Sequence, residues 1–239
     1  MKSEDVPATT PVIVGVGQIV ERIDAPNYRM LSSVELAAEA ARRACADAAA
    51  NVEIAPKIDT IVGLRTFEHS TPQYVTPFGK SNNFPHSIAR RIGAAPATAI
   101  WAPVGGDTPQ TMLAELCERI AAGQTRVALL AGGEAIATAK HLQTTKQTVD
   151  WSESIDAPVD DRGLRLKGLR TRYGRLHRIV GGPDSYALLE NARRRRLQRG
   201  REDYLLDMAR LFAPFTHVAA RNPYSMTSKV YSAEELATV

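Results

Sequence analysis

The feature that most constrains the fold is an alternation of apolar runs and amphipathic segments over residues 11–134. Runs rich in β-branched residues predict four strands, at 11–18, 58–65, 98–104 and 126–134. Apolar residues at helical spacing predict three helices between them, at 33–50, 84–92 and about 108–122. Strands that alternate with helices form βαβ units, so we expect an α/β fold with a mostly parallel sheet covered on both faces.

The pattern changes after Glu134. Residues 136–182 hold polar clusters, several glycines and Pro158, without a sustained period. Two helices are then predicted, at about 184–198 and 202–219, and Pro214 should end or kink the second. The tail from Asn222 is loop-like, although Ser232 and Glu235 are typical of a capped helix start. We therefore divide the sequence into a half-core at 1–135 and an α-rich region at 136–239.

Composition excludes several classes of protein. With 239 residues, 44% hydrophobic and 23% charged, the chain has ample material for a core and is neither collagen-like nor mostly disordered. No run approaches about 18 uninterrupted apolar residues, so we expect no membrane span. The N-terminus is polar and acidic, without an apolar signal region. Cys45 and Cys117 fall in helix-like patterns and are interpreted as reduced core residues of a cytoplasmic protein.

Basic side chains concentrate in one band. The formal net charge is +4, and residues 162–201 hold 13 Lys and Arg against only Asp184 and Glu190. The arginines at 193–196 decorate a helix end, where a solvated cationic turn is the ordinary explanation. The cluster at 162–178 is either a solvated surface or one that faces an anion, such as a phosphorylated cofactor or nucleic acid. Tyr173 is the only aromatic residue among these arginines, which argues against a stacking platform for single-stranded nucleic acid.

Other candidate motifs carry little chemistry. Gly15-Val16-Gly17 follows a predicted strand, but Val20 stands where a dinucleotide fingerprint needs its third glycine, so we interpret the glycines as a strand end. The five histidines are scattered, and none pairs with Cys, Asp or Glu at metal-ligand spacing. Three carboxylates near strand ends show no acid–base spacing, and we interpret them as strand-end or solvated side chains: Asp59, Glu68 and Glu134.

The turn at 104–110, VGGDTPQ, is more informative. Paired glycines between a strand and a helix allow close backbone approach, and a helix start offers free N–H groups to an anion or a carbonyl oxygen. Asp107 or Thr108 can cap the helix, with Pro109 in its first turn. The turn is either a well-capped connection or a ligand pocket at the carboxyl end of a strand.

Taken in order, the motifs resemble acetyl-CoA acetyltransferase-like proteins of the thiolase superfamily. The matching segments span nearly the whole chain: PVIVGVGQIVERIDAP, SSVELAAEAARRACADAA, IDTIVGLRTFE, GKSNNFPHSIARRIGAAPA, VGGDTPQ, ERIAAGQTRVALLAGGEA, LLENARRRRL and LFAPFTHVAARNPYS. The resemblance implies a βαβαβ half-core, an α-rich loop domain that helps bind coenzyme A, and homodimerisation through the third strand.

Two departures from the family pattern bear on activity. The position of the acyl-accepting cysteine corresponds to Gly106, which cannot supply the thiolate that thiolase chemistry needs. Some thiolase-like proteins carry a similar Gly-Gly-x-Ser/Thr-Pro-Gln turn, so this absence is consistent with a subgroup. The second βαβαβ half, with its Gly-His-Pro segment and further cysteine, is also missing from this sequence.

We therefore expect an acyl-CoA-handling protein without thiolase activity of its own and without catalytic residues. The expected acyl pocket comprises Gly105, Gly106, Asp107 and Thr108, and the expected coenzyme A phosphate ligands are Arg162, Arg165, Lys167, Arg170 and Arg172. One alternative is a non-catalytic subunit that pairs with a chain supplying the missing half, because half a core exposes apolar area. Self-association or such a partner is expected in either case. A nucleic-acid-binding module is the weakest alternative.

Overall fold

The computed structural model describes residues 7, 9–164, 171–179 and 181–238. It divides into two compact units, Met1–Lys167 and Gly168–Val239. Residues 136–161 lie in the first unit, so this unit extends past the boundary near residue 135 that we expect from the sequence. The division at 135 concerns correspondence to a half-core and stays a prediction.

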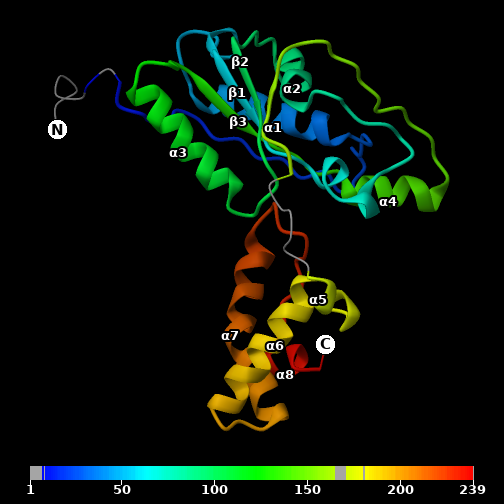
Figure 1. Cartoon of the computed structure of the whole chain (residues 1–239). Coiled ribbons are helices and arrows are strands. Elements are labelled where there is room, and N and C mark those ends of the chain that lie inside the picture. Colours follow the sequence, from blue (N-terminus) through cyan, green and yellow to red (C-terminus); the bar gives the residue numbers. More distant parts are fainter. Residues whose placement is uncertain (1–6, 8, 165–170, 180, 239) are drawn as a thin grey trace. The chain divides into compact units, whose positions relative to one another are not determined.

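The first unit is built on an all-parallel sheet with strand order β3-β1-β2-β4 (Figure 1). The strands are β1 (Thr60–Gly63), β2 (Thr98–Trp101), β3 (Ala128–Ala131) and the two-residue β4 (Asp160–Asp161). In the central strand, Thr60 lies opposite Thr98 of β2 and Ala128 of β3. The parallel α/β class predicted from the sequence is therefore confirmed.

Helices cover both faces of this sheet (Figure 1). Alternate strand residues Ile61, Trp101 and Leu129 belong to the core beneath α1 (Ser33–Asp47) and α2 (Phe84–Ile92). Their neighbours Val62 and Ile100 pack on the opposite side, with Met112 and Leu116 of α3 (Thr108–Ala121). The two-residue period of a strand thus serves two helix layers at once.

Local sequence signals explain where these helices begin and end. Ser32 caps α1 and forms a capping box with Glu35, which satisfies two backbone N–H groups. The Asn83 side chain accepts from the His86 N–H at the start of α2, and Gly93 ends that helix in the left-handed conformation, at φ 75°. All three helices predicted over residues 33–122 are present.

The predicted strand at 11–18 is wrong. Residues 11–18 are extended but belong to no strand, and Val12, Ile13, Val14 and Val16 are between 57% and 71% exposed. The segment lies along α1, where a Cβ atom at Gly15 would come within 2.2 Å of the Ala44 carbonyl oxygen. Within the described residues, β3 is an edge strand with one neighbour, and the segment does not pair with its open side.

Several short elements were not predicted. α4 (Ile136–Thr145) follows β3, and its Ala139 and Leu142 pack with Phe78. The 3-10 helices η2 (Ala55–Lys57), η3 (Phe67–His69) and η4 (Pro72–Tyr74) occupy the connections around β1. Among the described residues, no helix is both long and apolar enough to cross a bilayer.

The second unit is helical. It comprises α5 (Arg172–Leu176), α6 (Gly182–Arg196), α7 (Arg201–Arg221) and α8 (Ala233–Leu236). α7 runs through Pro214 to Arg221, so this proline does not end the helix. The capped start predicted at Ser232 is confirmed, because Ser232 and Glu235 form a capping box.

Candidate functional site

A cavity of about 530 Å³ lies at the carboxyl ends of β1, β2 and β3, and we call it the sheet-end cavity. Its walls come from the segments that follow these strands: Leu64–Phe67 and Ser70 after β1, Pro103–Gly106 with Thr108 and Pro109 after β2, and Gly132–Glu134 after β3. Parallel strands bring their carboxyl ends to one edge of the sheet, where α/β proteins usually bind ligands.

The glycine turn after β2 forms one wall of this cavity. Gly105, Gly106 and Thr108 line it, whereas Asp107 is not one of the wall residues. A Cβ atom at Gly106 would meet no atom within 4 Å, but one at Gly105 would come within 2.7 Å of Thr108 Oγ1. The turn is therefore packed at Gly105 and open at Gly106. That these residues hold an acyl group stays a prediction.

The start of α3 contributes Thr108 and Pro109 to this wall. Asp107 occupies the N-cap position without a capping hydrogen bond from its side chain, and Pro109 lies in the first turn, as expected. The first N–H groups of a helix have no intrahelical acceptor, but in α3 Pro109 has no N–H and the Thr108 N–H donates to the Gly105 carbonyl oxygen at 3.2 Å. Thr108 is only 2% exposed, and its buried hydroxyl has no hydrogen-bond partner among the described residues. A ligand oxygen at this position would satisfy this hydroxyl.

Glu134 lies on the wall formed by the segment after β3. The Phe67 N–H donates to its Oε1 at 2.8 Å, which links the ends of β3 and β1. Glu134 opens to solvent through the cavity, but enough protein surrounds its carboxyl that burial raises its pKa to about 7. The neighbouring Glu68 raises this pKa further, because two negative charges repel.

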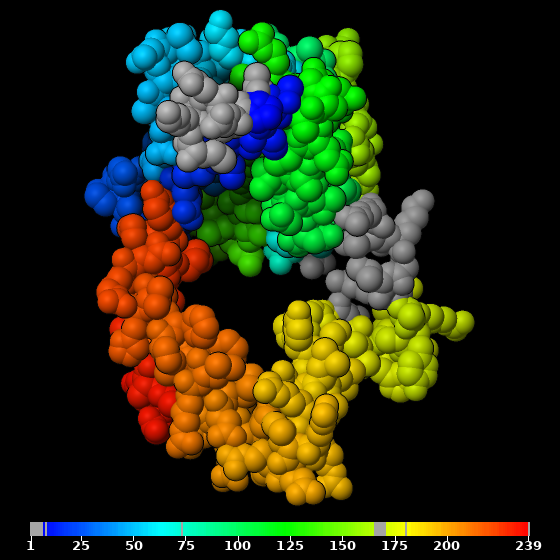
Figure 2. All heavy atoms as spheres, turned by 90° about the vertical axis from the view of Figure 1, so that its left-hand side faces the viewer, coloured from blue at the N-terminus to red at the C-terminus, as the bar shows by residue number. Residues whose placement is uncertain are grey.

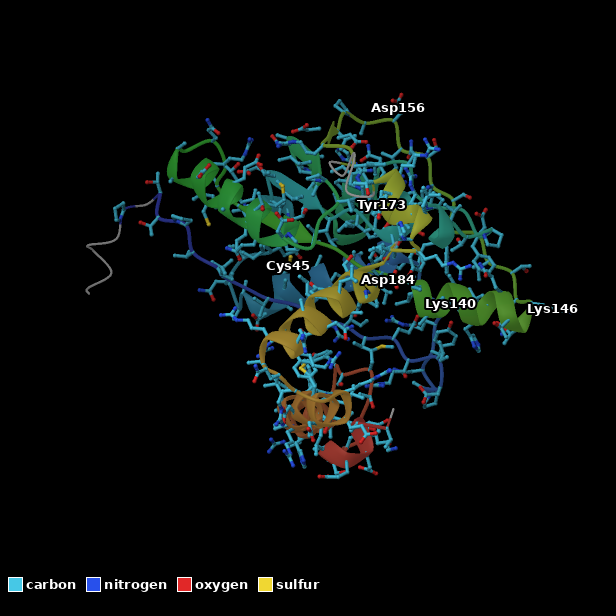
Figure 3. All side chains as sticks on the ribbon, turned by 60° about the horizontal axis from the view of Figure 1, so that its bottom comes forward. Cys45, Lys140, Lys146, Asp156, Tyr173 and Asp184 are labelled. Carbon is cyan, nitrogen blue, oxygen red and sulfur yellow. The ribbon has the colours of Figure 1, made fainter. Side chains whose placement is uncertain are left out.

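Glu68 lies on η3 and is more enclosed, with a side chain that is 12% exposed. Burial raises its pKa, opposed by a hydrogen bond from the Ser33 hydroxyl and by the charge of Lys80. A smaller cavity of about 110 Å³ is lined by both Glu68 and Glu134, together with Lys140 of α4 (Figure 3). The structure thus brings together two carboxylates that the sequence interpretation treated as unrelated strand-end or solvated groups.

Polar side chains near Glu68 already have hydrogen-bond or ion-pair partners. His69 Nε2 contacts the Ser81 carbonyl oxygen at 2.7 Å, and its Nδ1 contacts the Thr66 hydroxyl at 2.6 Å. Burial lowers the pKa of His69 to about 4, so the ring is neutral at pH 7. Arg65 lies 4.2 Å over the Trp101 ring and pairs with Asp161.

The predicted phosphate ligands do not form one described cluster. Arg165, Lys167 and Arg170 lie outside the described residues. Arg162 is paired with Glu115 at 3.0 Å and with Asp160 at 2.6 Å, so its charge is already compensated within the first unit. Arg172 is exposed at the start of α5, in the second unit. Binding of coenzyme A phosphates by these side chains stays a prediction.

Metal and thiol chemistry find little support in the described part of the chain. No group of three or more His, Cys, Asp or Glu residues there could hold a metal ion. Cys45 on α1 (Figure 3) and Cys117 on α3 are free thiols, both partly buried. Burial raises the pKa of Cys45, which keeps its thiol protonated and unreactive.

A comparison with solved structures tests the resemblance to thiolases at the level of the fold. The chain is similar to a monomeric SCP2-thiolase-like protein type 1 (STLP1) from Mycobacterium smegmatis, with 38% sequence identity and a TM-score of 0.68. The match covers 98% of this chain. It covers 40% of that chain, so the present sequence spans less than half of its neighbour's length.

The chain has a thiolase-like fold. No family model and no curated protein matches it. The resemblance read from the sequence motifs is therefore confirmed at the level of the thiolase-like fold, while membership of the acetyl-CoA acetyltransferase group is not. The neighbour is described as monomeric. Homodimerisation of this thiolase-like chain stays a prediction.

Proposed function

We propose that this thiolase-like chain binds the acyl thioester of coenzyme A in the sheet-end cavity without forming a covalent acyl-enzyme. The observation that carries this proposal is the cavity itself, with Gly105, Gly106 and Thr108 in the wall where α3 begins. A thioester carbonyl oxygen is an acceptor, and the Thr108 hydroxyl in this wall is a donor without a hydrogen-bond partner among the described residues.

The absence of a thiol separates this proposal from thiolase activity. Thiolase chemistry transfers an acyl group to a cysteine thiolate, and Gly106 has no side chain that could accept it. Cys117 lies about three turns further along α3, at about 3.6 residues per turn, and does not line the cavity. In this proposal the chain binds acyl-CoA as a ligand and does not catalyse its conversion.

Calorimetric titration with acetyl-CoA tests the proposal. Wild-type protein should release or absorb measurable heat, and Gly106→Trp should abolish it, because the cavity has room at that position for a ring that would displace the ligand. Ala122→Trp is the matched control, since Ala122 is exposed at the opposite end of α3. No heat from the wild type with excess acetyl-CoA would end the proposal.

A second candidate function is a non-catalytic subunit that pairs with a chain supplying the rest of the thiolase-like fold. A groove of about 550 Å³ favours it. Its walls are the extended residues 11–17, the edge strand β3, part of α1, and the face of α3 that carries Leu113, Cys117 and Ile120. Figure 2 shows the blue N-terminal segment beside the green helix on this side of the molecule. Two extended backbones flank the groove, which suits an inserted strand.

Photo-crosslinking in the native host tests this second candidate. A benzophenone amino acid at Val14 should capture one polypeptide, identified by mass spectrometry as the remaining part of a thiolase-like fold. The same probe at Val52, which is 59% exposed and is not a groove residue, should not capture it. Equal capture at both positions would contradict a specific partner.

A further inference from the structure

We propose that Glu134 recognises the acyl carbonyl group through a proton on its carboxyl, and that Glu68 is the positioning residue that keeps this proton there. The inference rests on the proposed binding of an acyl thioester in the sheet-end cavity. It adds a chemical criterion: the site favours a neutral thioester over a free carboxylate, because an uncharged carboxyl can donate a hydrogen bond to a carbonyl oxygen.

The position of Glu134 carries the first step of the argument. Its carboxyl is the only acidic group in the sheet-end cavity wall among the described residues, and Gly106 and Thr108 line the same cavity. The Phe67 N–H fixes Oε1 at 2.8 Å. One oxygen is thus held by the backbone, so the other is the oxygen that remains for a proton and for a ligand.

The second step concerns the charges around Glu134. Glu68 shares the walls of the smaller cavity with it, and two carboxylates so placed resist ionising together. Two nearby cations already have partners of their own. Arg65 pairs with Asp161, and Lys80 Nζ donates to the Glu68 carbonyl oxygen at 3.0 Å. His69 on η3 is neutral at pH 7. The remaining nearby cation among the described residues is Lys140, which lines the smaller cavity together with both carboxylates.

These surroundings determine the pH at which the site can work. Burial and Glu68 raise the pKa of Glu134 to about 7, so the carboxyl is mostly protonated at pH 6 and mostly ionised at pH 8. If only the protonated form binds, the apparent affinity falls in proportion to its population, by about tenfold between these two values. Ionisation also places a negative charge next to the carbonyl oxygen, which weakens binding in the same direction.

The test is the affinity for acetyl-CoA at pH 6 and pH 8, measured by calorimetry. The wild type should lose about tenfold in affinity between them. Glu134→Gln keeps an uncharged donor and should bind equally at both values. The phosphates of acetyl-CoA titrate identically in the two experiments, so the difference between the proteins reports Glu134 alone.

Glu68→Gln separates positioning from a merely structural role. Removing the neighbouring charge should lower the pKa of Glu134 and move the loss of affinity to lower pH, while the affinity at the acidic limit stays unchanged. Carbon-13 NMR of labelled glutamate side chains, with Glu134→Gln as the assignment, should show the same shift without any ligand.

The outcomes distinguish the two proposals. If no protein binds acetyl-CoA at either pH, the proposed function is wrong. If the wild type binds with the same affinity at both, acyl-CoA binding stands and the role of Glu134 is overturned. Should Glu134→Gln fail to fold, as judged by circular dichroism, the pH profiles of the wild type and Glu68→Gln still decide between these results.

Discussion

At the scale of single residues, Gly106 leaves space in the sheet-end cavity but supplies no reactive side chain. A Cβ atom there would meet no atom within 4 Å, so the cavity has room for a side chain that the sequence does not provide. At this position the thiol is therefore missing although there is space for its side chain.

A cysteine at this position should be reactive. In Gly106→Cys the new thiol would lie beside the start of α3, where partial positive charge lowers a thiol pKa and increases the thiolate fraction. We expect iodoacetamide to label it about tenfold faster than Cys117 on the same helix. Peptide mass spectrometry at timed intervals measures both rates. Equal rates would mean that the cavity does not present this position to solvent or to the helix start.

His69 should make the folded state sensitive to acid. Its folded pKa of about 4 lies below the ordinary 6.5, so the unfolded chain binds more protons between these values. Stability contributed by neutral His69 is therefore fully present above pH 6.5 and is lost as pH falls toward 4. Between pH 7.5 and pH 5 this amounts to about 2 kcal/mol.

Urea unfolding at several pH values measures this effect. Glu134 acts in the opposite sense, because its raised pKa favours the folded state at lower pH, so the informative quantity is the difference between two proteins. His69→Gln retains hydrogen-bonding groups and should lose less stability between pH 7.5 and pH 5 than the wild type. If the stabilities of the wild type and His69→Gln change equally with pH, a group other than His69 is responsible.

At the scale of elements, the N-terminal segment depends on glycine for its place. Gly15 and Gly17 lie on α1 so closely that a Cβ atom would come within 2.2 Å of the Ala44 carbonyl oxygen and 2.1 Å of the Ala40 carbonyl oxygen. The segment is further held by the Val16 N–H, which donates to Asp47 at 2.9 Å. Because the backbone of the segment lies against the backbone of α1, no flexible side-chain end could move to make room for a Cβ atom.

Gly15→Ala should therefore be destabilising. Either α1 or the segment has to shift, and such overpacking costs about 1–3 kcal/mol. Gly106→Ala is the matched control, because the same added methyl group meets no atom there and should change stability by less than about 0.5 kcal/mol. Guanidinium unfolding compares the two. Equal stabilities would show that the segment does not pack on α1.

Helices and their ends could be predicted from the sequence because their signals are local. Ser32 and Glu35 lie three positions apart, and Gly93 and Gly123 mark ends where positive φ is observed. The strand at 11–18 could not be judged in this way. Its composition favours a strand, but pairing depends on a distant neighbour that the segment itself does not specify.

The same distinction applies to the site. The glycine turn at 104–110 carried its own signal and lines the cavity as a ligand pocket would require. The proximity of Glu68 and Glu134 could not be predicted, since it depends on β1 and β3 pairing in parallel. α4 was missed because its Ala- and Thr-rich sequence has only a weak apolar face, although Leu142 is fully buried.

At the scale of the whole molecule, apolar surface remains uncovered in each unit. The first unit exposes Val12, Ile13, Val14 and Val16 along the groove. Among the described residues of the second unit, only Tyr204 and Ala209 of α7 are buried, while Leu211, Phe212 and Phe215 are at least half exposed. Patches of this kind usually mark an interface or a tendency to associate.

Exposed apolar surface of this extent should bind a hydrophobic dye. We expect anilinonaphthalene sulfonate to fluoresce with the native protein, and light scattering to show self-association at micromolar concentration. Val14→Lys should reduce both signals, because it introduces a charge into the groove, whereas Val52→Lys at another exposed site should not. A monodisperse monomer that leaves the dye dark would contradict this expectation.

The parallel register of the sheet also governs how the chain reaches its native state. Thr60 of β1 pairs with Thr98 on one side and with Ala128 on the other. Because both pairings are parallel, neither can form from a β-hairpin. Each pairing has to close a long loop before it gains any contact. Refolding should consequently be slow for a domain of this size. During synthesis, one side of β1 stays unpaired until residue 131 has left the ribosome.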